Sequence, residues 1–381
     1  MSLDVRIRKK MEHYTLDVTF RSEGGIFSLL GESGSGKTAA LKCIAGILTP
    51  DEGRIVVDDE VLFDSMAKIN VPANKRRTGF LVHDFALFPT MTVEENIRLA
   101  VETGLLSGAW KPGNAGNPTA VQDAGIMKRD AKVALSRKAA EYLREFSLDG
   151  IGGYYPCELS PSQKLRAAAA RMLAAGPRLV LLDDPFSTLE GFTKVAMLRE
   201  LKQQLDQRGI PAVFASTDRD EVYAMSSGVC VMKHGVSEQA QRKTLFFDDP
   251  KTMTGALLSG CENVTQVHAV NATHALSADW GMMFCFPAAG GFERLPAGIS
   301  AIGIRAADFQ VKRGKEPCFR FPVKDVRIED GLHEWTIYFR PGNRHGAELL
   351  FKAAKSSFTK EELTSLHELY VPCGKVLRLV R

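Results

Sequence analysis

The chain has 381 residues, a length typical of two or three domains at about 150 residues each. Charged residues make up 25% and hydrophobic residues 45%, which is ordinary globular usage and excludes a disordered, collagen-like or simple coiled-coil protein. The net charge of +4 is too small to indicate nucleic-acid binding, and no apolar run approaches the roughly 18 residues of a membrane-spanning helix.

The N-terminal segment and the cysteines indicate the compartment. Residues 1–10 carry charges but no apolar segment of the kind found in signal peptides. The seven cysteines are scattered and form no Cys-x-x-Cys pair, which fits reduced thiols better than a disulfide framework or a zinc site. These features predict a soluble cytoplasmic protein.

Taken in chain order, the first two thirds of the sequence alternate predicted strands and helices. Residues 1–22 alternate apolar and polar side chains, as in an edge hairpin, and Ile26–Leu30 form a short buried strand. This order predicts an α/β fold with a mainly parallel sheet covered by helices. The further predicted strands are 54–63, 79–82, 179–182, 212–216 and 229–232, and the predicted helices are 38–48, 190–208 and 219–226.

Two changes of pattern predict the domain organisation. A helical segment, about residues 92–175, is interrupted by glycines and prolines over residues 104–125, which predict an inserted surface loop. After about residue 258 the pattern changes to short alternating strands, among them 319–323 and 335–339. We therefore expect an α/β domain over 1–258, with a helical subdomain inside it, and a small β-barrel-like domain over 259–381.

A glycine-rich segment between a predicted strand and a predicted helix fits the pattern G-x-x-x-x-G-K-[ST]. Its glycines let successive backbone N–H groups point at one phosphate chain, and the following helix adds its own free N–H groups. The alternative is an ordinary glycine-rich turn, but the strand–loop–helix context favours nucleotide binding. The predicted nucleotide-binding residues are Gly31, Glu32, Ser33, Gly34, Ser35, Gly36, Lys37 and Thr38.

Two carboxylates follow the apolar strand 179–182. Asp183 is predicted to hold Mg²⁺ together with the Thr38 hydroxyl, and Asp184 to polarise the attacking water. By themselves these residues would more often be strand-end carboxylates that cap a turn. The phosphate loop upstream favours the metal site, with ATP and Mg²⁺ as the expected cofactors.

Four segments resemble the ATPase subunits of ABC transporters. Residues 159–163 (LSPSQ) resemble the LSGGQ signature, and residues 184–190 (DPFSTLE) resemble the stretch that follows the acidic strand in this family. Residues 85–97 are close to the segment after the family's Q-loop, and residues 303–308 (GIRAAD) look like part of the C-terminal regulatory domain of importer ATPases. The resemblance covers nearly the whole chain and is closest to the molybdate-type oxyanion importers.

The resemblance implies an arrangement with partners. In this family two such subunits, identical or different, sit head to tail and bind nucleotide between the phosphate loop of one and the signature of the other. It implies an ATPase that docks on membrane permease subunits, peripherally at the cytoplasmic face of the cell membrane, and that binds no nucleic acid. Tyr14 is an expected adenine-stacking residue by its place before the phosphate loop, or else an ordinary tyrosine of an amphipathic strand.

The chain departs from the family pattern where hydrolysis is carried out. The expected catalytic residues are Asp184 at the glutamate position, His83 at the Q-loop glutamine position and Thr217 at the switch-histidine position. Aspartate withdraws the carboxylate by one bond, about 1.5 Å. A misplacement of about 1 Å can cost about 100-fold in rate.

The signature is altered as well. Ser160 and Gln163 have capping-box spacing, and Pro161 suits the first helical position, so a normal helix start explains these residues structurally. In the resemblance Ser160, Ser162 and Gln163 face the partner's nucleotide. Pro161 removes one backbone N–H there, and Ser162 adds a side chain, so we expect weaker nucleotide binding at this site.

Three functions remain open from the sequence. The first is the ATPase of an oxyanion importer with reduced hydrolysis, and the second is a nucleotide-binding regulatory subunit that hydrolyses ATP poorly. The third is an ABC-type protein outside transport. Such proteins usually carry duplicated cassettes or long coiled coils, whereas this chain has one phosphate loop and no heptad repeat.

Overall fold

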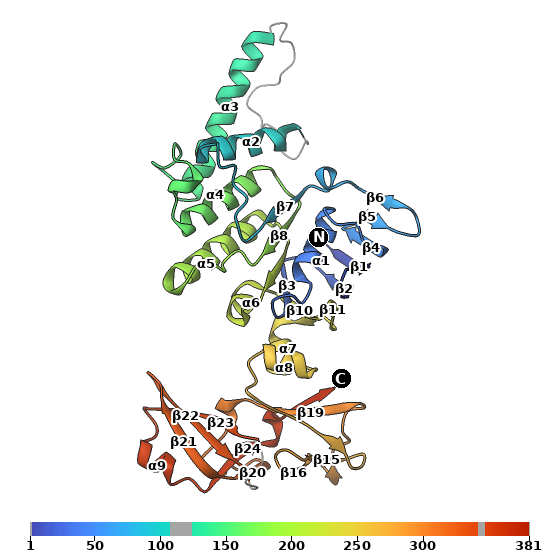
Figure 1. The fold of residues 1–381 in the computed structure, drawn as a ribbon, viewed down its shortest axis with the longest axis vertical. Coiled ribbons are helices and arrows are strands. Elements are labelled where there is room, and N and C mark those ends of the chain that lie inside the picture. Colours follow the sequence, from blue (N-terminus) through green and yellow to red (C-terminus); the bar gives the residue numbers. More distant parts are fainter. Residues whose placement is uncertain (1, 107–123, 342–346, 381) are drawn as a thin grey trace. The chain divides into compact units, whose positions relative to one another are not determined.

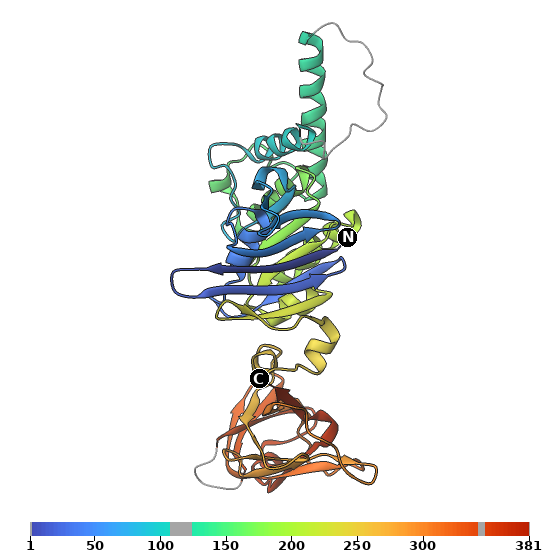
Figure 2. The ribbon, with the colours of Figure 1, turned by 90° about the vertical axis from the view of Figure 1, so that its right-hand side faces the viewer.

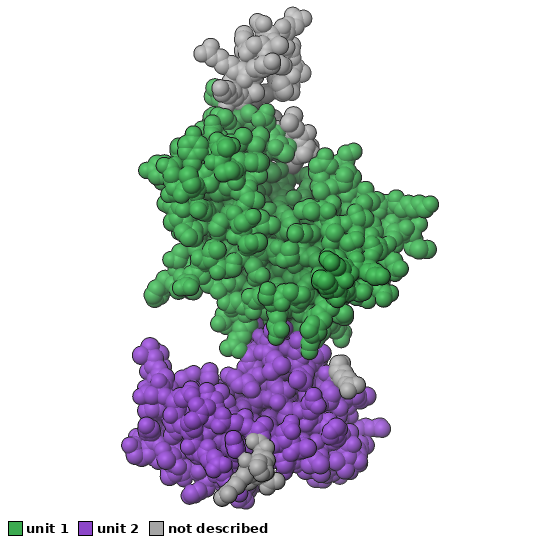
Figure 3. All heavy atoms as spheres, in the orientation of Figure 1, with its two compact units in different colours: residues 1–243 green, residues 244–381 purple. Residues whose placement is uncertain are grey.

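The computed structural model describes residues 2–106, 124–341 and 347–380, which form two compact units, Met1–Lys243 and Thr244–Arg381 (Figure 3). The boundary expected at residue 258 lies further along the chain, after α8 (Met253–Leu258). This helix belongs to unit 2, where Ala256 packs in an apolar cluster with Cys261 and Leu379. Most of the predicted loop over 104–125 lies outside the described residues.

Within the described part of unit 1, twelve strands form one sheet in the order β6-β5-β4-β1-β2-β11-β10-β3-β9-β8-β7, with β12 beside β10 (Figure 1). The strands are β1 Leu3–Lys10, β2 Thr15–Ser22, β3 Ile26–Leu30, β4 Glu52–Val57, β5 Glu60–Asp64, β6 Ile69–Asn70, β7 Thr78–Leu81, β8 Leu179–Asp183, β9 Ala212–Ser216, β10 Gly228–Lys233, β11 Val236–Ser237 and β12 Gln241–Arg242.

The sheet is mixed, which corrects the expectation of a mainly parallel one. Strands β7, β8, β9, β3 and β10 are parallel neighbours, whereas β2, β1, β4, β5 and β6 pair antiparallel; Figure 2 shows this second group in blue, side by side. The β1–β2 hairpin forms as predicted but is not at an edge, because β4 pairs with β1 and β11 pairs with β2. The strand predicted over 54–63 is divided between β4 and β5.

The six helices in the described part of unit 1 are α1 Lys37–Ala45, α2 Val93–Leu106, α3 Ala124–Glu145, α4 Pro161–Ala174, α5 Gly191–Arg208 and α6 Arg219–Met225, with 3₁₀ turns at Ala73–Lys75 and Pro156–Glu158. Helices α2, α3 and α4 contact one another and lie within the predicted helical subdomain (Figure 1). In the described residues no helix is both long enough and apolar enough to cross a membrane.

The parallel half of the sheet supplies the core of unit 1. All five residues of β3, β8 and β9 are buried, as expected for parallel strands covered on both faces. Helix α1 packs on this half through Leu41 and Ile44. Its last carbonyls are satisfied by the fully buried Arg76, whose Nη1 donates to Cys43 O and Ile44 O, both at 2.9 Å. Arg76 thus fixes the end of α1 that lies away from the phosphate loop.

Unit 2 is β-rich, as predicted, and its core is a cluster of aromatic side chains. Phe321 and Phe339, at positions where the sequence alternates, are fully buried, and the Phe309 ring packs edge-on against both. Its strands are β13 Asn263–Gln266, β14 His268–Ala269, β15 His274–Ser277, β16 Met282–Cys285, β17 Pro287–Ala288, β18 Gly291–Phe292, β19 Ile299–Ile304, β20 Cys318–Pro322, β21 Lys324–Asp330, β22 Glu334–Arg340, β23 Leu349–Ala354, β24 Glu368–Pro372 and β25 Leu377–Val380.

The helices α7 Lys243–Asp248, α8 and α9 Lys360–Thr364 complete the described elements, with 3₁₀ turns at Ala306–Asp308 and Cys373–Lys375. Within unit 2, Arg305 donates to the backbone oxygens of Phe247 and Ser259, and Arg327 pairs with Glu329. These arginines therefore serve internal contacts of the unit.

Candidate functional site

The glycine-rich loop lies at the carboxyl end of β3 and leads directly into α1. An ideal Cβ on Gly31 would lie only 2.3 Å from Met232 O, so this close approach of two backbones requires glycine. Gly34 (φ 79°) and Gly36 (φ 100°) adopt the left-handed conformation, which is costly for other residues. Gly36 is the N-cap of α1, so the loop turns the chain directly into the free N–H groups of the helix.

Lys37 is 5% exposed, and its ammonium is held by the loop itself. Its Nζ donates to Gly31 O at 2.7 Å and to Glu32 O at 2.9 Å. Burial lowers the pKa of Lys37, and the carboxylates of Asp184 and Asp183 oppose this shift. Lys37 is thus a buried cation whose charge interacts with the carboxylates of Asp183 and Asp184.

Ser35, in the same loop, is also buried. Its Oγ has no hydrogen-bond partner among the described residues. A buried hydroxyl without a partner is costly in a folded protein, so a hydrogen-bond partner for Ser35 Oγ would be stabilising.

Thr38 and Asp183 are brought together as predicted. Thr38 Oγ1 donates to Asp183 Oδ1 at 2.9 Å, which joins the start of α1 to the end of β8. Oxygen atoms of this kind are the ligands that Mg²⁺ prefers. Because the described residues contain no group of three or more metal-ligating side chains, a metal here would take its remaining ligands from phosphate and water.

The register of three parallel strands brings the predicted catalytic residues to the same edge of the sheet. Leu81 of β7 pairs with Leu182 of β8, and Ala215 of β9 pairs with Asp183. His83, Asp184 and Thr217 therefore follow the ends of adjacent strands. Their positions on neighbouring strand ends could be expected from the β/α order, but their contacts could not.

Asp184 has a strained backbone, with φ of 45°, and its carboxylate points toward the next strand end. Its Oδ1 accepts a hydrogen bond from the Thr217 N–H at 3.3 Å. Burial raises the pKa of the Asp184 carboxyl; Lys37, the Thr217 N–H and His83 oppose this shift, whereas Asp183 adds to it. The contact from Thr217 is made by its backbone, so it does not depend on the side chain that replaces histidine.

Tyr14 lies close to the phosphate loop. It is half-buried, and its ring packs on Gly235, where an ideal Cβ would lie 2.5 Å from Tyr14 Cδ2. The Cα of Gly235 in turn lies 3.3 Å from the position of an ideal Cβ on Gly36. One glycine therefore separates the tyrosine from the loop, which leaves both interpretations of Tyr14 open.

The altered signature forms the predicted capping box at the start of α4. Ser160 Oγ accepts from Gln163 N at 3.3 Å, and Gln163 Oε1 accepts from Ser160 N at 2.9 Å. Ser162 Oγ lies 3.2 Å from Ser160 Oγ. Within the described residues these hydrogen bonds remain inside the signature and do not reach the phosphate loop.

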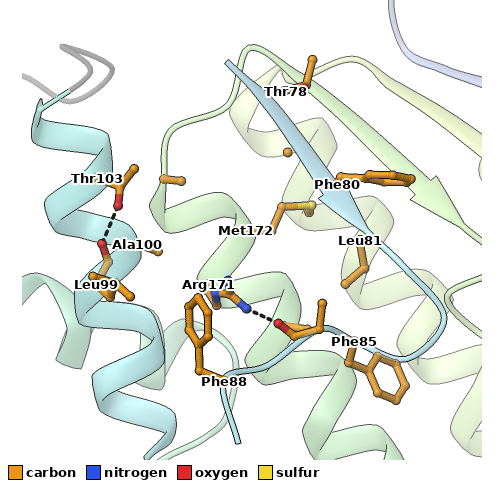
Figure 4. A pocket seen from close by; sticks show the side chains of 14 residues that line it. Thr78, Phe80, Leu81, Phe85, Phe88, Leu99, Ala100, Thr103, Arg171 and Met172 are labelled. Atoms are coloured by element: carbon orange, nitrogen blue, oxygen red, sulfur yellow. Dashed lines mark hydrogen bonds between the residues drawn. The ribbon is translucent and has the colours of Figure 1, made fainter. Parts of the chain in front are cut away.

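Two features near the site were not found from the sequence. The first is a charged cluster of Lys194, Ser216, Asp218 and Glu221, treated below. The second is a hollow of about 290 Å³ between β7, α2 and α4, where the Arg171 guanidinium lies 4.1 Å from the Phe88 ring centre (Figure 4). Arg171 also donates to Ala86 O, in a segment where Ala86 has a positive φ. The one sequence feature that pointed to this region was the resemblance of residues 85–97 to the segment after the Q-loop of the ABC family.

Comparison with known proteins identifies the family to which this chain belongs. The family described as ABC transporter matches residues 15–187. The molybdenum import ATP-binding protein ModC of Rhizobium johnstonii is 33% identical over 282 residues, which cover 73% of this chain and 71% of the relative. This chain belongs to the ABC transporter family. Its unit 1 is therefore an ABC ATPase cassette, as the sequence motifs predicted.

Other relatives of this cassette carry different names. The sulfate/thiosulfate import ATP-binding protein CysA of Caulobacter vibrioides is 33% identical over 61% of this chain and 60% of the relative. The spermidine/putrescine import ATP-binding protein PotA of Methylococcus capsulatus is 33% identical over 67% of this chain and 59% of the relative. The match thus spans less than two thirds of these two relatives' length, and the three named cargoes differ in chemistry.

Proposed function

We propose that this chain is the ATP-binding subunit of an importer and couples ATP binding and hydrolysis to uptake of an oxyanion of the molybdate kind. It acts with a second cassette and with membrane permease subunits at the cytoplasmic face of the membrane. The observation that carries the proposal is the joint position of Lys37, the Thr38–Asp183 pair and Asp184 at one edge of the sheet.

The phosphate loop fits a nucleotide. The free N–H groups at the start of α1 and the Lys37 ammonium supply positive charge, and the unpartnered Ser35 Oγ offers a further hydrogen bond to a phosphate oxygen. Thr38 and Asp183 are the residues that would hold Mg²⁺, which would neutralise charge on the phosphates. The phosphate loop and the start of α1 therefore form an anion-binding site with one buried cation, the Lys37 ammonium.

Slow hydrolysis is part of the proposal. Asp184 is one methylene shorter than glutamate and is already engaged by the Thr217 N–H, and the exposed Thr217 side chain cannot carry a positive charge. His83 lies near this carboxylate, and its charge lowers the pKa of Asp184. We therefore expect ATP to bind normally and to be hydrolysed slowly.

The test combines a binding titration with a single-turnover hydrolysis assay on the purified protein. The variant Lys37→Met should lose ATP binding. Lys42→Met is the matched control, because Lys42 is exposed on the same helix, and it should bind ATP as the wild type does. ATP binding that survives Lys37→Met would contradict the proposed site. A turnover rate equal to that of ordinary importer ATPases would contradict the expected slow hydrolysis.

The hollow beside Phe88 is the proposed docking place of a permease segment. Phe88 and Leu99 at its rim are more than a third exposed, and Arg171 beneath them offers a cation whose pKa burial lowers. These residues lie in and beside residues 85–97, which resemble the docking-type segment of the family. Co-purification with a membrane permease, lost in Phe88→Asp, tests this partner and separates a transport role from an ABC-type role outside transport.

An oxyanion is the cargo we favour, since two of the three relatives above are named for molybdenum or for sulfate and thiosulfate import. The relative named for spermidine and putrescine makes a cationic cargo the competing outcome. Uptake of radiolabelled molybdate, sulfate and spermidine by cells with and without this chain tests the choice. Loss of spermidine uptake alone would contradict it.

A second function, a nucleotide-binding regulatory subunit with little hydrolysis, is favoured by one observation. The Ser160 hydroxyl is engaged in capping α4 and Pro161 lacks an N–H, so the signature offers fewer groups to a partner's nucleotide. Turnover measured in the complex with the permease separates the two functions, because only the first requires hydrolysis by this chain.

A further inference from the structure

A charged cluster of Lys194, Ser216, Asp218 and Glu221 lies next to the candidate site. Glu221, on α6, is 4% exposed and Ser216, at the end of β9, is fully buried. Ser216 Oγ donates to Glu221 Oε2 at 2.6 Å. Lys194 Nζ, from α5, lies 2.6 Å from Glu221 Oε1 and 2.6 Å from Asp218 Oδ2. The cluster therefore ties two helices to one strand end.

The same cluster fixes the backbone on both sides of Thr217. Before it, the Ser216 hydroxyl is held by Glu221; after it, Asp218 N donates to Ser216 Oγ at 3.0 Å. Asp218 also caps α6, since its Oδ1 accepts from Asp220 N at 2.8 Å. The direction of the Thr217 N–H, which donates to Asp184 Oδ1, follows from these contacts.

Lys194 also links the chain that follows β8 to the chain that follows β9. It lies in the first turn of α5, where its N–H donates to Glu190 O at 3.3 Å, and α5 follows the segment that starts at Asp184. Its ammonium reaches across to Asp218 and Glu221 at the start of α6. One side chain thus spans the two segments whose ends meet in the Asp184–Thr217 contact.

The charges of the cluster depend on one another. Burial raises the pKa of the Glu221 carboxyl, and hydrogen bonds from Lys194 and Ser216 oppose this shift. Although burial acts in the other direction, hydrogen bonds to Asp218 and Glu221 raise the pKa of Lys194. Removing the lysine would leave a buried carboxylate without its cation, which is strongly unfavourable and forces either protonation or rearrangement.

We propose that Lys194, acting through Glu221 and Ser216, is a positioning residue that holds the Thr217 N–H on the Asp184 carboxylate. The inference rests on the proposed ATPase function. It describes a contact to Asp184 that does not require a histidine side chain at position 217. The carboxylate is oriented by a backbone N–H, and the cluster keeps that N–H in place.

The test compares Lys194→Met, Lys194→Arg and a control on the same helix, Arg199→Met, at an exposed position. Lys194→Met should lower the single-turnover rate about 10- to 100-fold. Lys194→Arg should restore the rate, and Arg199→Met should leave the rate unchanged.

Amide hydrogen exchange supplies a readout that needs no hydrolysis. Exchange in a peptide that covers 212–218 should rise in Lys194→Met and return to the wild-type rate in Lys194→Arg. If the wild-type protein proves inactive but this exchange pattern holds, the ATPase proposal fails and the positioning contact stands. Unchanged exchange in Lys194→Met overturns the positioning contact even when the wild-type protein is an active ATPase.

Discussion

Replacing Gly31 by alanine tests the tightest contact of the phosphate loop. An ideal Cβ there lies 2.3 Å from Met232 O and 2.7 Å from Ser35 Oγ. A carbon–oxygen contact needs about 3.3 Å, so Met232 O and the loop must separate by about 1 Å. Met232 belongs to β10, which pairs with β3 and β11, so the carbonyl cannot move alone.

The size of the effect follows from this forced separation. Overpacking of a tight contact costs about 1–3 kcal/mol of unfolding free energy. The displaced loop should also weaken ATP binding about tenfold or more, since a loss of about 1.4 kcal/mol corresponds to tenfold in affinity.

The assay is urea denaturation followed by circular dichroism, together with a calorimetric titration with ATP. Gly153→Ala is the matched control, because Gly153 is exposed and an ideal Cβ there meets no atom within 4 Å. Alanine should leave stability unchanged at Gly153 or raise it by up to about 1 kcal/mol. Equal stability and equal ATP affinity of Gly31→Ala and Gly153→Ala would refute the reasoning.

Three further predictions concern the site and the helix that carries the phosphate loop. The double variant Asp184→Glu with Thr217→His should hydrolyse ATP faster than the wild type in a single-turnover assay; an unchanged rate would mean that these positions do not limit hydrolysis. Asp184→Asn should be at least as stable as the wild type at neutral pH. Burial raises the folded-state pKa of Asp184 above its unfolded value, so the wild type loses stability as pH rises from the unfolded to the folded pKa. The stability advantage of the Asn variant should therefore disappear at acidic pH. Denaturation at several pH values measures this dependence. Arg76→Met should destabilise unit 1 by about 2–4 kcal/mol, because it removes the buried guanidinium donors to Cys43 O and Ile44 O, and of the two the Gly46 N–H still serves Cys43 O. Melting temperatures compared with those of Arg77→Met, a control at the neighbouring exposed residue, provide the measurement.

The sequence predicted the parallel half of the sheet well, because its signal is local. Strands β3, β8 and β9 are continuous buried runs, and each is followed by a turn and a helix. The antiparallel half was harder to predict. Strand β11 has only two residues, Val236 and Ser237, yet its pairing with β2 removes the hairpin from the sheet edge. A two-residue strand has no periodicity that a sequence can display.

The candidate site shows the same division. The glycines and Lys37 could be predicted because the loop is contiguous and its conformation is fixed by residue type. The Lys194–Glu221 pair could not, because the two residues lie on different helices and each is an ordinary charged residue of an amphipathic helix. The backbone contact from Thr217 to Asp184 was also hidden, since any residue except proline at position 217 could supply that N–H.

The mixed sheet has a consequence for the order of folding. Strands β1, β2, β4 and β5 pair with one another within residues 3–64, so these pairings can form early at small cost in loop closure. Strand β3 pairs with β9 and β10, which come from the far end of unit 1, so the phosphate loop after β3 takes shape late. We therefore expect bound ATP to slow unfolding while leaving the rate of refolding almost unchanged.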